Sequence, residues 1–211
     1  MAVQSQGRAT GVPFAALAFV FAALAACGGG GSEADWLFPL WVHTGVAAGD
    51  LDRDGRTDVV TIAKLSTSMT DHQGRLTVYR QSPSGRFTAE SYTVGSYPWR
   101  VEVRDLDGDG LPDLLLLDVG ADSQADVLYL LLQDPADPGR FVAPRTIAAG
   151  LSTYDFAVED LDGDGAPDIV IAGGPGGGDG ALLLVQDSTR RGSFRAPQAI
   201  ALPGRASQVA A

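Results

Sequence analysis

Cysteine and histidine are almost absent from this sequence of 211 residues, and each absence excludes a class of site. Because Cys27 is the only cysteine, no disulfide can form within the chain. His43 and His72 lie far apart with no cysteine or glutamate at ligand spacing, so we interpret them as surface or core side chains rather than zinc ligands. The sequence also lacks the serine, histidine and aspartate order of a hydrolase triad and the nucleophile elbow of lipases.

Concentrated positive charge is missing as well. The formal net charge is −11, and the cations are almost all arginines scattered along the chain. Only Arg190 and Arg191 adjoin, and we interpret that pair as a solvated turn. Because no basic stripe could follow a phosphate backbone, nucleic acid is not an expected partner.

The longest apolar run lies near the N-terminus. Val12–Ala26 is a run of 15 residues, shorter than the roughly 20 that span a bilayer, and it follows a single cation, Arg8. This pattern is typical of an export signal. Its end, "LAAC" at Leu24–Cys27, resembles the lipobox of bacterial lipoprotein precursors. The resemblance implies cleavage before Cys27, a lipid on the Cys27 sulfur and an acylated new N-terminus.

The N-terminal region therefore divides into two expected segments. Residues 1–26 would be the lipoprotein signal peptide, and residues 27–34 the lipid anchor with a glycine-rich tether. The exported protein would then be held at the membrane, facing the periplasm or on the cell surface. The alternative is an ordinary signal peptide that is cut after Ala23–Ala25 and leaves Cys27 without a role.

Negative charge, in contrast, is concentrated in three short segments. "DLDRDGRTD" at Asp50–Asp58 is followed by "DLDGDGLPD" at Asp105–Asp113 and "DLDGDGAPD" at Asp160–Asp168, each beginning 55 residues after the one before. Together they hold 12 of the 26 acidic residues. Because clustered carboxylates repel one another, we expect a cation in each segment.

The residues between these segments predict strands. Each acidic segment runs into a short apolar stretch, as in "VVTIA" from Val59, and then into a second stretch that ends in glutamine at Gln81, Gln133 or Gln186. A G-x-F turn and a further extended stretch follow. About four strands in some 55 residues are typical of a β-propeller blade, so the expected fold class is all-β, with four-stranded antiparallel blades.

The order of these features resembles the FG-GAP/VCBS repeat, best known from the propeller of integrin α-chains. The resemblance extends over residues 35–211, although "FVAP" at Phe141 and "FRAP" at Phe194 match the family's Phe-Gly and Gly-Ala-Pro signatures only in part. It implies a propeller of seven or eight blades that holds calcium in hairpin loops on one rim.

The chemistry of the nine-residue segment indicates calcium independently, because alternate residues of a tight loop can direct oxygens to one centre. We expect ligands from the carboxylates at positions one, three, five and nine and from the carbonyl at position seven, with three Ca²⁺ ions in all. Leu161, at position two of the third segment, should point into the core. The expected ligands are Asp50, Asp52, Asp54, Arg56 and Asp58; Asp105, Asp107, Asp109, Leu111 and Asp113; and Asp160, Asp162, Asp164, Ala166 and Asp168.

The acidic segments fit an EF-hand or a magnesium site less well. An EF-hand needs a glutamate at position twelve and a helix after the loop, but those positions hold Thr61, Leu116 and Ile171 within apolar stretches. Magnesium prefers fewer carboxylates and keeps more water. A plain acidic turn without a metal is the remaining alternative.

Two function classes are compatible with this sequence. The first is a non-catalytic, calcium-binding module for an extracytoplasmic protein or glycan; the alternative is a propeller or accessory domain of a polysaccharide lyase or hydrolase. We also expect the propeller to be incomplete, because the distance from each G-x-F phenylalanine to the next acidic loop places a fourth loop at residue 212 or 213. The repeats would then form an open arc of about three blades, since closed propellers have about four to eight.

Overall fold

A computed structural model describes residues 41–65, 73–120, 125–175 and 180–202. All of them belong to a compact unit that spans Pro39–Ala211. The expected signal peptide, tether and lipidation site lie outside the described residues, as does the expected start of the repeats at residue 35.

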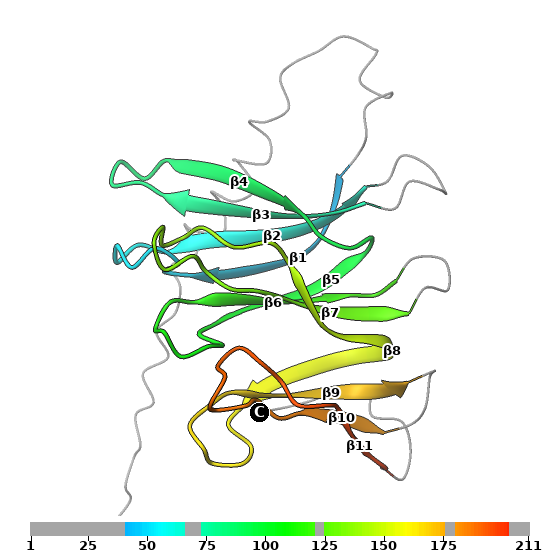
Figure 1. Cartoon of the computed structure of the whole chain (residues 1–211). Helices are drawn as coiled ribbons and strands as arrows, with labels where there is room; N and C mark the ends of the chain where they lie inside the picture. The colour runs from blue at the N-terminus through cyan, green and yellow to red at the C-terminus, as the bar shows by residue number, and fades with distance from the viewer. Residues whose placement is uncertain (1–40, 66–72, 121–124, 176–179, 203–211) are drawn as a thin grey trace, which may run out of the picture. The chain divides into compact units, whose positions relative to one another are not determined.

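The described residues form strands joined by turns and loops, so the all-β prediction is confirmed (Figure 1). The strands are β1 (Trp41–Gly49), β2 (Asp58–Leu65), β3 (Gly74–Gln81), β4 (Phe87–Thr93), β5 (Pro98–Arg104), β6 (Asp113–Asp118), β7 (Asp126–Leu131), β8 (Arg145–Glu159), β9 (Asp168–Pro175), β10 (Ala181–Leu184) and β11 (Gln198–Ile200).

All neighbouring strands pair antiparallel, in a four-stranded sheet β1-β2-β3-β4 and a seven-stranded sheet β11-β10-β9-β8-β7-β6-β5. The long strand β8 divides the larger sheet into two units. Its first half pairs with β7 as far as Leu151, and its second half pairs with β9 from Leu151 onward. A register shift between Thr153 and Asp155 interrupts this second pairing.

The repeat therefore corresponds to a four-stranded blade, as the sequence predicts. Blade 1 contains β1–β4; blade 2 contains β5, β6, β7 and the first half of β8; and blade 3 contains the second half of β8 with β9, β10 and β11. Within the described residues no strand of blade 3 pairs with blade 1, so the three blades form an open arc rather than a closed ring.

The core consists of two apolar layers, one between each pair of neighbouring blades. Strand β6, with the sequence "DLLLLD", lies between them and is buried on both faces. Its Leu114 and Leu116 pack with Val60 and Ile62 of blade 1. Its Leu115 and Leu117 pack into the second layer, which includes Ile169 and Ile171 of blade 3. The period of two along a strand explains why four consecutive leucines supply both layers.

Side chains of the first strands add polar contacts between blades 2 and 3. Arg100 of β5 donates to the carbonyl oxygen of Phe156 at 2.7 Å and pairs with Asp155, both on β8. Arg104 donates in the same way to the carbonyl oxygen of Val158. These contacts hold neighbouring first strands together.

The three acidic segments occupy equivalent places in the blades. Loop 1 (Asp50–Asp58) joins β1 to β2, loop 2 (Asp105–Asp113) joins β5 to β6, and loop 3 (Asp160–Asp168) joins β8 to β9. All three lie along one rim, at the left of Figure 1. The propeller topology thus places three chemically equivalent loops on the same side of the molecule.

Candidate metal centres

Each acidic loop is a tight turn in which the aspartates bind the backbone amides of the same loop. In all three loops the carboxylate of the first aspartate accepts the N–H of the glycine at position six, at N–O distances between 2.9 and 3.0 Å. This glycine has a φ of 81° to 86°, a left-handed conformation that is costly for residues with a Cβ atom. The loop sequence therefore determines a turn that draws its carboxylates inward. The three pairs are Asp50 and Gly55, Asp105 and Gly110, and Asp160 and Gly165.

The ninth aspartate connects each loop to the end of the third strand of its blade or to the residues just after it. Asp58, Asp113 and Asp168 are at most 1% exposed. One carboxylate oxygen accepts the N–H of the second loop residue, and the other accepts the N–H of the glutamine that ends the second apolar stretch, all at 2.8–3.0 Å. Two hydrogen bonds at each ninth position thus hold a carboxylate in the interior that would otherwise be costly to bury.

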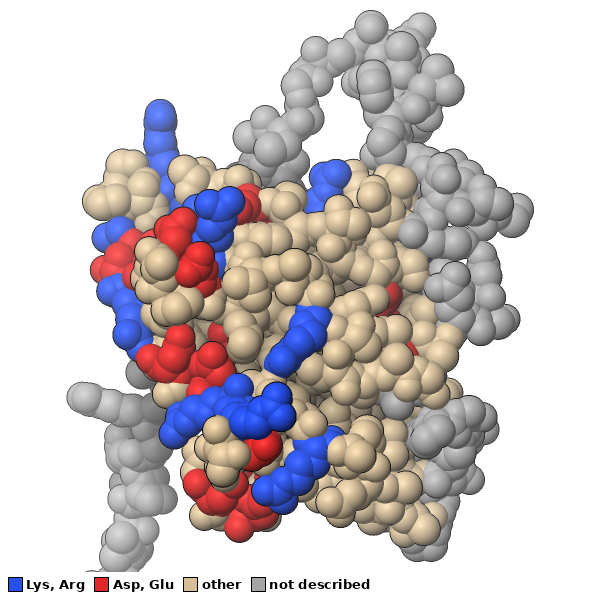
Figure 2. Space-filling model, in the orientation of Figure 1, with Lys and Arg blue, Asp and Glu red and all other residues tan. Residues whose placement is uncertain are grey.

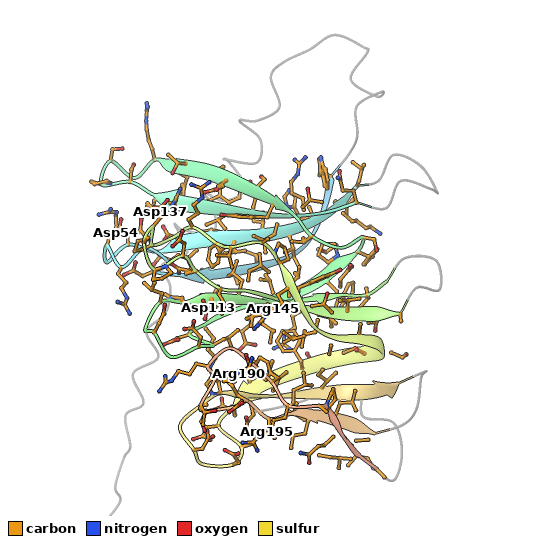
Figure 3. The ribbon with its side chains drawn as sticks, in the orientation of Figure 1. Asp54, Asp113, Asp137, Arg145, Arg190 and Arg195 are labelled. Carbon is orange, nitrogen blue, oxygen red and sulfur yellow. The ribbon has the colours of Figure 1, made fainter. Side chains whose placement is uncertain are left out.

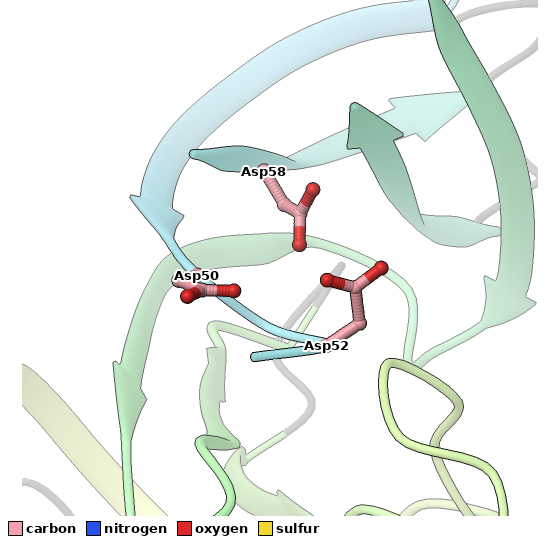
Figure 4. Close-up of side chains that lie close together, drawn as sticks. All are labelled: Asp50, Asp52 and Asp58. Carbon is pink, nitrogen blue, oxygen red and sulfur yellow. The ribbon is translucent and has the colours of Figure 1, made fainter. Parts of the chain in front are cut away.

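The fold brings three carboxylates of each loop together. In loop 1, ligand oxygens of Asp50, Asp52 and Asp58 all lie within 4.8 Å of one another. Figure 4 shows these carboxylates pointing toward a shared space from the end of β1, the loop and the start of β2. The equivalent groups are Asp105, Asp107 and Asp113 in loop 2, and Asp160, Asp162 and Asp168 in loop 3.

The aspartate at position five lies outside these groups of three. Its Oδ1 atom accepts the N–H of the residue two positions later, at 2.9 Å for Asp54, 2.7 Å for Asp109 and 2.9 Å for Asp164. Asp54 also forms an ion pair with Arg56. Ligation by position five, and by the carbonyl groups of Arg56, Leu111 and Ala166, stays a prediction.

Electrostatics favour a cation among the carboxylates of loops 1 and 2. Burial is the main cause that raises the pKa of Asp113 to about 7, and the charges of Asp107 and Asp109 raise it further. Burial and neighbouring aspartates also raise the pKa of Asp58 and of Asp107. A divalent cation would reverse this repulsion. The donor set consists of hard carboxylate oxygens, which fits calcium better than metals that prefer nitrogen or sulfur.

Each loop runs directly into a buried strand. Thr61, Leu116 and Ile171, at position twelve of the three segments, lie within β2, β6 and β9. The helix and the carboxylate that an EF-hand requires are therefore replaced by a strand and by side chains that offer no carboxylate.

A buried glutamine joins each of loops 1 and 2 to the next blade. Gln133 of blade 2 is 3% exposed and donates through Nε2 to the carbonyl oxygens of Leu51 in loop 1, at 2.8 Å, and of Pro112. Its Oε1 accepts the N–H of Gly139 at 2.7 Å. We call this arrangement the glutamine bridge.

Blade 3 repeats the glutamine bridge toward blade 2. Gln186 is 1% exposed and contacts the carbonyl oxygens of Leu106 and Pro167 and the N–H of Gly192 at 2.8–2.9 Å. The sequence alone predicts no role for these glutamines. Their recurrence at the same place in each repeat is the signal that could have indicated one.

The prediction that Leu161 points into the core is wrong. Leu51 and Leu106, at the equivalent position of loops 1 and 2, are 0% exposed, whereas Leu161 is 50% exposed. The first two leucines are covered because the following blade lies against their loops through its glutamine bridge. No described blade follows blade 3, so burial at this position depends on a neighbour and not on the loop itself.

Comparisons with known proteins agree with this architecture. The sequence pattern described as an FG-GAP-like repeat matches residues 65–116 and 105–171, and that described as an FG-GAP repeat matches residues 44–79. Together they cover more than half of the chain and include loops 1, 2 and 3. No curated protein matches the chain.

Proposed function

Because the chain belongs to the FG-GAP repeat family, we propose that it is a calcium-binding β-propeller module that binds a protein or glycan outside the cytoplasm, without catalytic activity. Each of loops 1–3 would hold one Ca²⁺ ion through its first, third and ninth aspartates. Bound calcium would make the loops of this rim more rigid. A partner that binds there would then cost less conformational entropy, because the loops are already ordered.

One observation carries the calcium proposal. The same three-carboxylate group recurs three times at equivalent places on one rim, and its ninth member is buried each time. A solvated acidic turn would have no need to bury a carboxylate, and burial opposes ionisation. A cation that occupies the group offsets both the burial and the mutual repulsion.

Calcium-dependent thermal stability tests this proposal. For a dissociation constant near 10⁻⁴ M, about 1 mM free calcium would stabilise each site by about 1.4 kcal/mol and three independent sites by about 4 kcal/mol. We expect the Tm of the full chain to fall in excess chelator and to recover with calcium but not with the same concentration of magnesium.

The matched variant is Asp52→Asn. Asp52 accepts the N–H of Asp54 at 3.2 Å, and an asparagine side-chain oxygen can keep that hydrogen bond while removing the charge. We expect this variant to lose about a third of the calcium-dependent increase in Tm. Its Tm in chelator should be equal to or slightly above that of the wild type, because one of the charges that repel Asp58 is removed. An identical Tm for the wild-type chain with and without calcium would exclude the metal sites.

The cellular location is proposed on sequence grounds. An export signal at residues 1–26 and a lipid on Cys27 would place the module at a membrane, facing the periplasm or exposed on the cell surface. Among the described residues no helix is long and apolar enough to cross a bilayer. If the purified chain cleaved a polysaccharide, the proposal of a non-catalytic binding module would be wrong. The alternative, a domain of a polysaccharide-active enzyme, would then be favoured.

A further inference from the structure

A pocket of about 360 Å³ lies between blades 2 and 3. One side is formed by the start of β8, with Arg145 and Ile147, and the other by the turn that follows β10, with Arg190, Phe194 and Arg195. Pockets of about 300–1,000 Å³ are the size that holds small molecules or single units of a polymer. None of the residues that line this arginine pocket belongs to the aspartate groups of loops 1–3.

The pocket concentrates positive charge on a chain whose net charge is −11. Its lining contains three arginines and one carboxylate, Asp187. Figure 3 labels Arg145, Arg190 and Arg195 near one another, and Figure 2 shows cationic side chains gathered in the same region. All three arginines are exposed. The guanidinium group of Arg145 already donates one hydrogen bond, to the carbonyl oxygen of Gly192.

The single carboxylate of the pocket already has partners within its own turn. Asp187 accepts hydrogen bonds from the hydroxyl of Thr189 at 2.6 Å and from its N–H at 3.1 Å. These bonds, together with the charges of Arg195 and Arg190, lower the pKa of Asp187. Arg195 also acts on Asp164 of loop 3, whose pKa is lowered chiefly by the N–H of Ala166. Within the pocket lining, the three cations exceed the one anion.

The pocket is held in shape by contacts on both sides. Phe194 and Ile147 are partly buried and pack against the core layer between blades 2 and 3, which gives the pocket an apolar floor. Arg145 donates to the carbonyl oxygen of Gly192, across the boundary between the blades. Gly192 is in turn held by Gln186 of the glutamine bridge. A ligand would therefore meet an apolar floor and one arginine, Arg145, that are already positioned.

The sequence alone indicates only a solvated turn for Arg190 and Arg191. In the structure Arg190 also lines the arginine pocket. The turn itself is present, because the N–H of Arg190 donates to the carbonyl oxygen of Asp187 at 2.7 Å. Arg191 donates to the carbonyl oxygen of Gly108 in loop 2 at 3.0 Å. One arginine of the pair lines the pocket, and the other contacts the neighbouring metal loop.

We propose that the arginine pocket binds a carboxylate-bearing sugar unit of an acidic glycan. A guanidinium group can bind a carboxylate through two parallel hydrogen bonds, and three such groups surround the pocket. The apolar floor fits the flat face of a sugar ring, and Ser193 and Thr146 offer hydroxyl groups to its hydroxyls. This inference rests on the proposed binding function and names the ligand class.

The test measures binding of a tetrasaccharide that contains glucuronate, by calorimetry on the full chain in calcium. We expect saturable binding that is lost with the carboxyl-reduced, neutral form of the same tetrasaccharide. The double variant Arg190→Gln with Arg195→Gln should weaken binding at least tenfold. The control, Arg86→Gln, changes an exposed arginine on the corresponding turn of blade 1 and should leave binding unchanged.

Three outcomes would overturn the inference. The first is no binding of the acidic tetrasaccharide, and the second is equal binding by wild type and the double variant. The third is equally tight binding of an oligoglutamate peptide, which would assign the pocket to acidic protein segments. Calcium-dependent Tm is measured on the same preparations. A failure of sugar binding with an intact calcium response therefore removes this inference alone, whereas loss of the calcium response removes the proposed metal sites.

Discussion

Replacement of Gln133 by alanine tests whether the glutamine bridges hold neighbouring blades together. The Gln133 side chain makes three hydrogen bonds, to the carbonyl oxygens of Leu51 and Pro112 and from the N–H of Gly139. Only the bond to Leu51 joins two blades directly. The other two fix the loop and the turn of blade 2 against which blade 1 packs.

The expected cost follows from the groups that lose their partners. Gln133→Ala leaves three backbone groups without this side chain at a position that is 3% exposed. At about 1 kcal/mol for each lost hydrogen bond, the free energy of unfolding should fall by about 3 kcal/mol. For a domain of about 150–250 residues this corresponds to a Tm lower by about 6–12 °C. Thermal denaturation followed by circular dichroism in saturating calcium measures the effect.

The matched control is Gln81→Ala. Gln81 ends the equivalent stretch of blade 1, and its backbone N–H contacts Asp58 as Gln133 contacts Asp113. No partner for its side-chain amide is found among the described residues, so this substitution should change the free energy of unfolding by less than about 0.5 kcal/mol. Equal losses for Gln81→Ala and Gln133→Ala, or no loss for Gln133→Ala, would refute the bridging role.

Three further predictions concern other parts of the chain. Because burial raises the pKa of Asp113 from 3.8 to about 7 in the metal-free fold, folding favours its protonated form, and metal-free stability should fall as pH rises between these values. Calcium needs the ionised carboxylate, so its increment in Tm should be larger at pH 8 than at pH 5.5; equal increments would contradict this. Gly95 has a φ of 45°, and an added Cβ would lie 1.6 Å from Asp118 Oδ2, so Gly95→Ala should cost at least about 2 kcal/mol in denaturant unfolding. Gly85 has a φ of 76° and no atom within 4 Å of an added Cβ, so Gly85→Ala should lower the free energy of unfolding by only about 1 kcal/mol. Equal losses for the two variants would argue against a clash between the added Cβ at position 95 and Asp118. Finally, Cys27→Ser should fail to be processed at that position or should appear in the soluble fraction. Mass spectrometry of the mature wild-type N-terminus checks the anchor, which a free thiol at Cys27 or a start upstream of it would remove.

The local chemistry of the acidic loops could be predicted from the sequence because all of its parts lie within nine residues. Aspartates at positions one and three and glycine at position six determine the turn through hydrogen bonds inside the loop. The ninth residue begins a buried strand, which brings its carboxylate beside the other two. Alternation along the loop also predicts a fourth carboxylate, at position five, which the structure does not place in the groups of three. A side chain such as Asp54 can be satisfied by the N–H of Arg56 as well as by an ion, and alternation cannot distinguish these partners.

What the sequence determined was therefore the repeating unit: four strands, an acidic loop between the first two, and a pattern of apolar residues with two buried faces. The tertiary structure decided every property that depends on the next blade. Burial of Leu51 and Leu106 but not Leu161, the glutamine bridges and the arginine pocket all join residues that belong to different repeats. Such contacts connect positions about 50 to 80 residues apart, as Gln133 and Leu51 do with a separation of 82. Their presence depends on how one sheet packs on the next, because a residue at the same repeat position is buried where a neighbouring blade covers it and exposed where none does.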